Sequence, residues 1–105
     1  MAILAIFTAN GWTPEMYDTL RNEVGWHHQQ PNGGIFHAFS SDDAGGAHVA
    51  DVWASPEDLN DFVNTRLAPT MQRLGFPMPD VQVYPVHNID AFAGVQQYIR
   101  QPIDA

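Results

Sequence analysis

The residues best suited to take part in a reaction are a histidine and an aspartate, each of which interrupts an apolar stretch. His37 lies within the run Gly34–Phe39, and Asp51 lies within the run Val49–Trp53. An imidazole can act as a general base near neutral pH, and a neighbouring carboxylate can orient it for that role. The same pair is also compatible with a purely structural role, because a carboxylate in such a strand must be paired or solvated.

Whether these two side chains meet depends on the turn between them. Asp42–Gly46 is a hairpin turn by composition, with strands expected at about 35–40 and 47–54. A five-residue loop over 42–46 pairs His37 with Asp51, whereas a four-residue loop pairs His37 with Ala50. A slip of one residue moves a side chain to the other face of a sheet, so the sequence leaves both registers open. We name His37 and Asp51 as the candidate catalytic residues.

Four further residues are candidates for holding a substrate. Trp53 and Tyr84 lie in expected strands, where they either line an aromatic cavity suited to a planar molecule or serve as plain core. Asn10 ends the first strand, where it either gates a pocket or forms the Asn-Gly turn. His87 closes the last strand, either at a cavity mouth or dimer edge or as a structural cap.

No motif predicts a metal or a cofactor. His27 and His28 are adjacent in a loop, so their rings diverge, and no third ligand stands at a spacing typical of metal sites. The two Gly-Gly pairs, at 33–34 and 45–46, fit turns and no phosphate-binding fingerprint. Cysteine and lysine are both absent, which excludes thiolate and Schiff-base chemistry. We therefore expect no metal and no cofactor.

The charge of the chain disfavours several partners. Twelve acidic and four basic residues give the 105-residue chain a net charge of −8. The basic residues form no cluster, so we expect no nucleic-acid partner and no binding to anionic membranes. No apolar run approaches the roughly 18 residues that span a bilayer, and the N-terminal stretch lacks the basic region of a secretory signal. Since the lack of cysteine fits a reducing compartment, we expect a cytoplasmic protein.

The order of the elements predicts an α+β, ferredoxin-like βαββαβ fold with a four-stranded antiparallel sheet. Both helices are expected to begin with a capping residue followed by proline, at Thr13-Pro14 and Ser55-Pro56. We expect the second helix to break or kink near Ala68 and to continue briefly to Leu74, because Pro69 does not fit a helix interior. The first strand is expected at 2–8, the first helix at 14–24, the second helix at 56–74, and the last strand at 81–88. These elements make one domain over 1–90, followed by a C-terminal tail at 91–105.

Two helices can cover only one face of a four-stranded sheet. The first strand is nevertheless apolar on both faces, with Ile3, Ala5 and Phe7 on one and Leu4 and Ile6 on the other. A second copy of the chain is the economical way to bury the second face. We therefore predict a homodimer, in which the tail docks on the partner subunit.

Five short stretches, in their order and spacing, carry a resemblance to a known group of proteins: Ile3–Phe7, Gly34–Ala38, Asp51–Ser55, Phe62–Pro69 and Val83–Asn88. Over residues 2–90 the chain resembles the dimeric α/β-barrel superfamily, and within it the small antibiotic-biosynthesis-monooxygenase-like proteins. The resemblance implies two sheets packed face to face and a ligand cavity between the sheet and the helices of each protomer. It implies a fold more firmly than an activity, because one fold hosts many functions.

The superfamily includes cofactor-independent monooxygenases that act on aromatic polyketides, heme-degrading enzymes and isomerases. The heme degraders place an asparagine near the end of the first strand and a tryptophan and a histidine on the second helix. Asn10 matches the asparagine, but Phe62 and Gln72 occupy the other two positions. We therefore do not expect heme degradation.

Two functional hypotheses follow. In the first, the chain is an enzyme similar to the cofactor-independent monooxygenases, or a cyclase or isomerase, acting on a small hydrophobic or aromatic molecule. His37 is the base and Asp51 orients it, and no cofactor is needed because the substrate carbanion itself activates oxygen. In the second, the protein is a non-catalytic small-molecule-binding or accessory dimer, in which His37 and Asp51 only satisfy each other. An open cavity beside His37 favours the first hypothesis, and a filled core favours the second.

Overall fold

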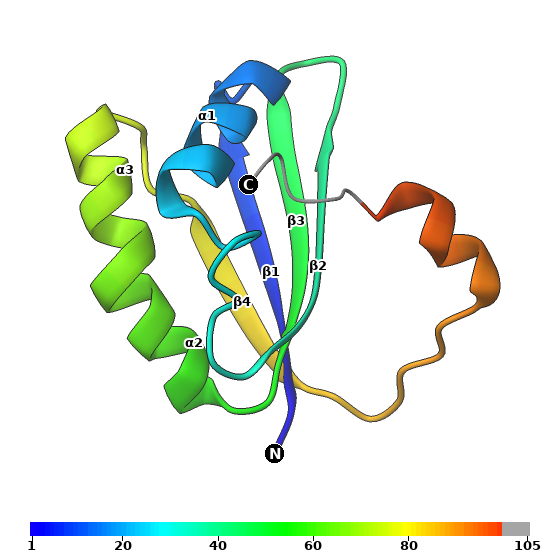
Figure 1. The fold of residues 1–105 in the computed structure, drawn as a ribbon. Helices are drawn as coiled ribbons and strands as arrows, with labels where there is room; N and C mark the ends of the chain where they lie inside the picture. The colour runs from blue at the N-terminus through cyan, green and yellow to red at the C-terminus, as the bar shows by residue number, and fades with distance from the viewer. Residues whose placement is uncertain (100–105) are drawn as a thin grey trace.

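The computed structural model describes residues 1–99 and has the predicted order of elements (Figure 1). Each half of the chain begins with a strand, and a short helical turn follows the last strand. The elements are β1 (Ile3–Asn10), α1 (Pro14–Val24), β2 (Gly34–Ser41), β3 (Gly46–Trp53), α2 (Pro56–Phe62), the π-helical turn η1 (Val63–Leu67), α3 (Ala68–Leu74), β4 (Asp80–Pro85) and the 3₁₀ helix η2 (Ala93–Tyr98).

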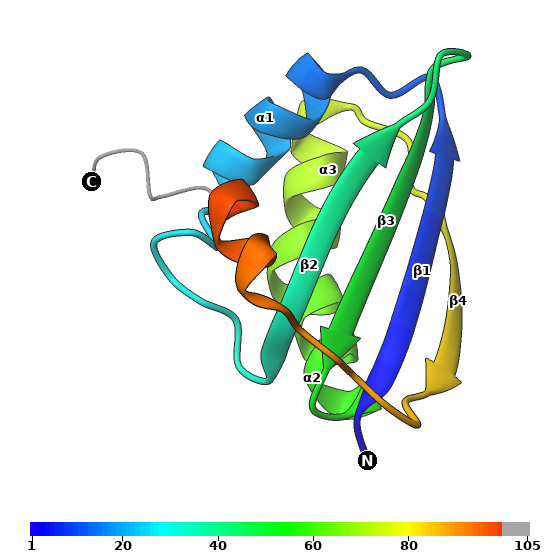
Figure 2. The same cartoon turned by 90° about the vertical axis from the view of Figure 1, so that its right-hand side faces the viewer.

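The four strands form one antiparallel sheet in the order β2-β3-β1-β4, with every helix from α1 to α3 on the same face (Figure 2). The predicted ferredoxin-like α+β fold is confirmed. The core lies between the sheet and the helices, because β1 alternates with a period of two. Ile3, Ala5 and Phe7 face the helices and are buried against Leu20 of α1 and Met71 of α3.

Local chemistry fixes the ends of α1 as predicted. The Thr13 side chain accepts a hydrogen bond from the backbone N–H of Met16 at 3.1 Å, and Pro14 occupies the first helical position. Gly25 ends the helix in the left-handed conformation, with φ of 72°, and its N–H bonds to the Arg21 carbonyl.

The irregularity expected near Ala68 is present as the π-helical turn η1, and the helix continues beyond it to Leu74 as expected. At this turn the N–H of Ala68 reaches the carbonyl of Val63, five residues back. This wider turn shifts the carbonyls that a proline ring would otherwise meet, so Pro69 fits into the first turn of α3. One continuous helical arm therefore covers the sheet.

The β2–β3 hairpin has the register predicted for a loop over 42–46, with Ser41 opposite Ala47 and His37 opposite Asp51. Asp42 organises the turn: its side chain accepts the N–H groups of Ala44 and Gly46 at 2.9 and 2.8 Å and lies 2.8 Å from Nε2 of His48. The hydrogen bond from His48, followed by the one from Gly46, lowers the pKa of Asp42 below its ordinary value. The turn thus selects one of the two registers that the sequence left open.

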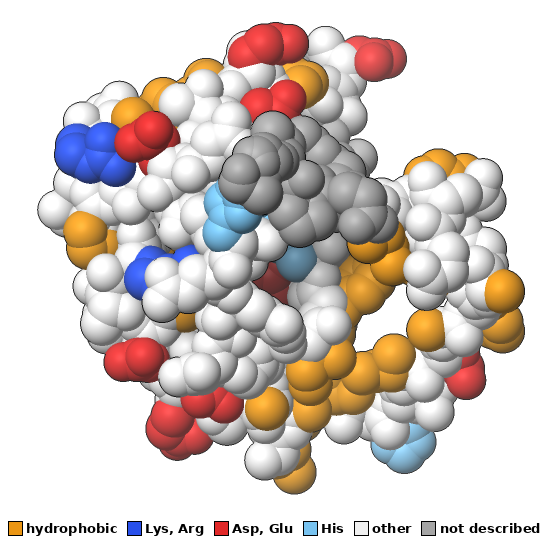
Figure 3. All heavy atoms as spheres, in the orientation of Figure 1, with side chains coloured by type: hydrophobic (Ala, Val, Ile, Leu, Met, Phe, Trp, Pro, Cys, Tyr) orange, Lys and Arg blue, Asp and Glu red, His pale blue; other side chains and the backbone are white. Residues whose placement is uncertain are grey.

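No helix of residues 1–99 packs on the outer face of the sheet. Leu4 and Ile6 of β1 are half-buried there, and Phe36 and Tyr84 on the flanking strands are 47% and 49% exposed. After β4 the chain turns away, and η2 stands off the sheet (Figure 1). Hydrophobic side chains gather along the gap between the segment that carries η2 and the rest of the domain (Figure 3).

Of the predicted tail at 91–105, residues 100–105 lie outside the described residues. Within residues 1–99, no helix has both the length and the apolar character needed to cross a membrane.

Candidate functional site

A cavity of about 430 Å³ opens between the sheet and the helices. This volume lies at the small end of the range for sites that bind small organic molecules. Most of the wall is apolar, and Ile99, the last described residue, contributes to it. Among residues 1–99, eight aromatic residues contribute to the lining: Phe7, Trp12, Tyr17, Trp26, Phe36, Phe39, Trp53 and Phe62.

His37 and Asp51 bring a polar group to this apolar wall. They are directly opposite each other on β2 and β3 and face the helices, and His37 Nδ1 lies 2.6 Å from Asp51 Oδ1. Pairing of neighbouring strands is enough to bring directly opposed side chains into contact. The Asp51 side chain is 11% exposed and that of His37 is 32% exposed, so the carboxylate lies behind the imidazole.

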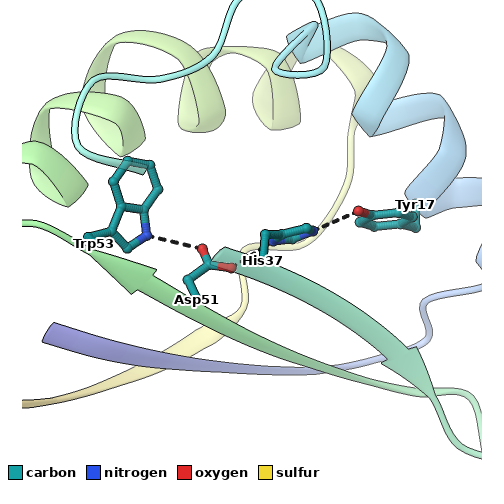
Figure 4. A network of polar contacts seen from close by, with 4 residues as sticks. All are labelled: Tyr17, His37, Asp51 and Trp53. Carbon is teal, nitrogen blue, oxygen red and sulfur yellow. Dashed lines mark hydrogen bonds and ion pairs between the residues drawn. The ribbon is translucent and has the colours of Figure 1, made fainter. Parts of the chain in front are cut away.

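The two residues form the centre of a longer chain of hydrogen bonds (Figure 4). Trp53 donates its Nε1–H to the second carboxylate oxygen of Asp51 at 3.2 Å. On the other side, the Tyr17 hydroxyl lies 2.6 Å from His37 Nε2. The order along the network is therefore Trp53, Asp51, His37 and Tyr17.

An ionised carboxylate only accepts hydrogen bonds, which sets the protonation of a neutral His37. Nδ1 carries the hydrogen and donates it to Asp51, so Nε2 is the acceptor and Tyr17 donates its hydroxyl hydrogen. The pair thus presents a basic nitrogen toward α1 with a negative charge behind it.

Aromatic packing holds this network in place. The ring of Tyr17 stacks on that of Phe39, with 4.0 Å between centroids and 17° between planes. It is also nearly parallel to the His37 ring, with 5.8 Å between centroids and 10° between planes. Trp26 meets His37 edge-on at 5.1 Å. Stacked and edge-on contacts of this kind restrict how each ring can turn.

The structure brings three of the predicted site residues together: His37, Asp51 and Trp53. Tyr84 pairs with Leu4, so it lies on the outer face of the sheet, where its hydroxyl donates to Gln82. The cavity lies on the opposite face. The prediction that Tyr84 lines it is therefore corrected.

Asn10 and His87 also lie away from this cavity. Asn10 is exposed and pairs with Gly46 at the end of β1, beyond the last strand position that lines the wall. His87 lies past the end of β4 at Pro85, beyond Val86, whose N–H bonds to the Ala2 carbonyl at 2.9 Å. Neither residue is among those that line the cavity.

Tyr17 is the functional residue that the sequence prediction missed. The apolar stripe of α1 was assigned to Met16, Leu20 and Val24. Leu20 and Val24 follow Tyr17 by three and seven residues. This spacing also places Tyr17 on the core side of the helix. That spacing was the available signal, but nothing in it indicated a partner on β2.

The wall favours an uncharged, planar ligand. Among residues 1–99, no arginine lines the cavity, and the Asp51 charge disfavours an anion. Within the same residues no group of three potential metal ligands comes together, and the rings of His27 and His28 pack on each other, with 4.1 Å between centroids. The site therefore combines an imidazole, a carboxylate in contact with it and an aromatic cavity wall.

The fold and the site together define a ferredoxin-like domain with a ligand cavity between sheet and helices. No family model and no curated protein matches the chain. Among solved structures, SnoaB, a cofactor-independent oxygenase from Streptomyces nogalater, aligns with a TM-score of 0.62 at 8% identity, over 84% of this chain and 94% of its own. A candidate antibiotic biosynthesis monooxygenase from Chloroflexus aurantiacus J-10-fl aligns at 0.63 and 15% identity, over 87% and 98%. Rv0793 from Mycobacterium tuberculosis aligns at 0.60 and 12% identity, over 87% and 100%.

These comparisons show the fold. The chain has the ferredoxin-like architecture of the antibiotic-biosynthesis-monooxygenase-like proteins, as the sequence resemblance implied. At such low identities, the activities of these proteins do not transfer to this chain.

Proposed function

We propose that the protein is an enzyme that removes a proton from an uncharged aromatic substrate and, in the oxygenase form of the reaction, lets the resulting carbanion react with oxygen. His37 is the base and Asp51 orients it. The observation that carries the proposal is the 2.6 Å contact between these two residues in the wall of an open, aromatic cavity. A filled core around His37 would have favoured an accessory role instead.

The reaction requires no cofactor, because the substrate supplies the electrons. A carbon acid flanked by aromatic rings gives its proton to the base and becomes a carbanion. The carbanion adds to oxygen, the peroxide takes up a proton, and loss of water leaves a ketone. A cyclase or isomerase would use the same first step and return the proton elsewhere on the substrate.

Asp51 supports this step electrostatically. When His37 gains a proton it becomes an imidazolium, and the carboxylate at 2.6 Å, whose side chain is only 11% exposed, stabilises that charge. Trp53 keeps the carboxylate directed at His37 by occupying its other oxygen. The role of Trp53 is therefore to position Asp51 as well as to form part of the wall.

We further propose that the working form is a cytoplasmic homodimer. The half-exposed side chains of Phe36 and Tyr84, with Leu4 and Ile6 between them, form an apolar surface on the outer face of the sheet. A second sheet packed on this surface would bury it. The exposed Phe92 and Tyr98 at either end of η2 support docking of the tail on the partner.

The test separates proton removal from the use of oxygen. Anthrone is a flat, uncharged probe with an acidic C–H between two aromatic rings. Without oxygen, the purified protein should speed exchange of this hydrogen for deuterium; in air, it should speed conversion of anthrone and oxygen to anthraquinone and water. His37→Ala should lower both rates about 100-fold or more, the usual contribution of a general base. Full exchange activity in a folded His37→Ala protein would refute the proposal.

A further inference from the structure

The hydroxyl of Tyr17 is hydrogen-bonded to the basic nitrogen of His37, Nε2. The hydroxyl oxygen lies 2.6 Å from Nε2, while Nδ1 is engaged with Asp51 at 2.6 Å. Both ring nitrogens of the proposed base are therefore already in short hydrogen bonds. A substrate can reach Nε2 directly only if Tyr17 moves away.

Tyr17 is held against such a movement. Its ring lies between two neighbours in the cavity wall, stacked on Phe39 at 4.0 Å and tilted against Trp26 at 6.0 Å. Phe39 is on the same strand as His37, two positions away, so it fixes Tyr17 relative to the imidazole. The phenol is thus a built part of the polar network, and it lines the cavity itself.

From this geometry we infer that Tyr17, rather than His37, is the residue that exchanges the proton with the substrate. This inference rests on the proposed function and assigns its first step to a different atom. The substrate proton passes to Tyr17 Oη, while the hydrogen of that hydroxyl passes to His37 Nε2. The substrate is left as a carbanion or enolate, and His37 is left as an imidazolium paired with Asp51. Reversal of both transfers restores the starting state, and no oxidant takes part.

The relay accounts for the need for Asp51. A phenol is a weaker acid than an imidazolium, so moving its proton to His37 is unfavourable in isolation. The Asp51 charge offsets this cost because it lies in contact with the imidazole and is shielded from water. The substrates that suit such a relay are uncharged aromatic carbon or oxygen acids whose acidic hydrogen reaches the Tyr17 hydroxyl.

Tyr17→Phe distinguishes the relay from direct attack by His37. The variant keeps the ring that packs on Phe39 and removes only the hydroxyl. Under the relay, exchange of the anthrone hydrogen for deuterium without oxygen falls about 100-fold, to the level of His37→Ala. If His37 acts directly, Tyr17→Phe uncovers Nε2, and the exchange rate stays the same or rises.

Thr19→Val is the control that also removes a hydroxyl from α1. Thr19 is exposed, lies two residues from Tyr17 and does not line the cavity, so loss of its hydroxyl should leave the exchange rate unchanged. Loss of exchange in Tyr17→Phe but not in Thr19→Val supports the inference. Full exchange in Tyr17→Phe together with loss in His37→Ala overturns it and leaves the proposed function standing. Full exchange in His37→Ala overturns both.

Nitrogen NMR of His37 gives a readout that needs no turnover. The relay requires Nδ1 to carry the hydrogen and Nε2 to accept one from Tyr17. In Tyr17→Phe, the Nε2 resonance should move toward that of a free acceptor, while the Nδ1 resonance stays in place. A wild-type His37 that carries its hydrogen on Nε2 would overturn the inference, even if no probe is turned over.

Discussion

At the scale of single residues, the site is organised around one carboxylate. Asp51 is 7% exposed, and its two oxygens accept hydrogen bonds from different partners, His37 and Trp53. A buried charge is stable only when its acceptors are used in this way. The residue types of His37 and Asp51 were enough to name both as candidates from sequence, but not to show that they pair. The donor role of Trp53 was not predictable, because it depends on how the indole is turned.

The hydrogen bond from Trp53 should be measurable by comparing two tryptophans. Trp53 and Trp12 are similarly buried, at 4% and 5%, but the Trp12 Nε1 has no hydrogen-bond partner within residues 1–99. Trp53→Phe should therefore lower the free energy of unfolding by about 2 kcal/mol more than Trp12→Phe, since a hydrogen bond to a charged group contributes roughly 1.5–3 kcal/mol. Urea denaturation of the two variants measures the difference. Equal losses would mean that the hydrogen bond contributes little.

At the scale of elements, two loops set where β2 lies. The turn over 42–46 sets its register, and the loop before β2 ties it to the end of β3 through the Ala54 N–H, which bonds to the Gly33 carbonyl at 2.8 Å. The sequence predicted the hairpin and its two registers. It could not choose between them, because the choice depends on the side-chain bonds that Asp42 makes within the turn.

Gly33 should be the more sensitive of two comparable glycines. Gly33 and Gly11 both adopt positive φ, at 77° and 75°, where an alanine costs about 1–2 kcal/mol. A Cβ at Gly11 meets nothing nearby, whereas one at Gly33 would collide with the Asp58 carboxylate, which also bonds to Ser55. Gly33→Ala should therefore lower the melting temperature clearly more than Gly11→Ala. Similar shifts would show that Asp58 moves aside at no cost.

The turn at Asp42 should make stability depend on pH in acid. Because the pKa of Asp42 is lowered in the folded state, its charged form stabilises the protein fully above its ordinary value of 3.8. That stabilisation is lost as the pH falls through the lower, folded-state value. The difference in melting temperature between the wild type and Asp42→Asn should therefore be constant near neutral pH and shrink below about pH 4. A difference that grows in acid would contradict this sign.

At the scale of the whole molecule, the sheet has two unlike faces. One is covered by helices and holds the cavity, and the other is apolar and carries no helix of residues 1–99. The alternation within β1 was enough to predict both apolar faces from sequence. The cavity was not predictable in the same way, because it exists only where the aromatic side chains of α1, β2 and β3 fail to fill the space between them.

A charge on the uncovered face should separate the proposed dimer. Ile6 lies at the centre of that face, so Ile6→Lys would bury an unpaired charge in the interface and should raise the dissociation constant at least about 100-fold. Asn60→Lys adds the same charge on exposed α2, in the opposite layer, and should leave the assembly unchanged. Sedimentation measures both. A wild-type protein that sediments as a monomer at all concentrations would refute the dimer.

The distribution of tryptophan gives the protein an optical property of its own. The chain has three tryptophans, and Trp12, Trp26 and Trp53 all line the cavity. Nearly all of the intrinsic emission excited at long ultraviolet wavelengths therefore originates within contact distance of a bound molecule. Any aromatic compound that enters should quench or shift this emission, so a library of unlabelled compounds can be screened by fluorescence before any reaction is known.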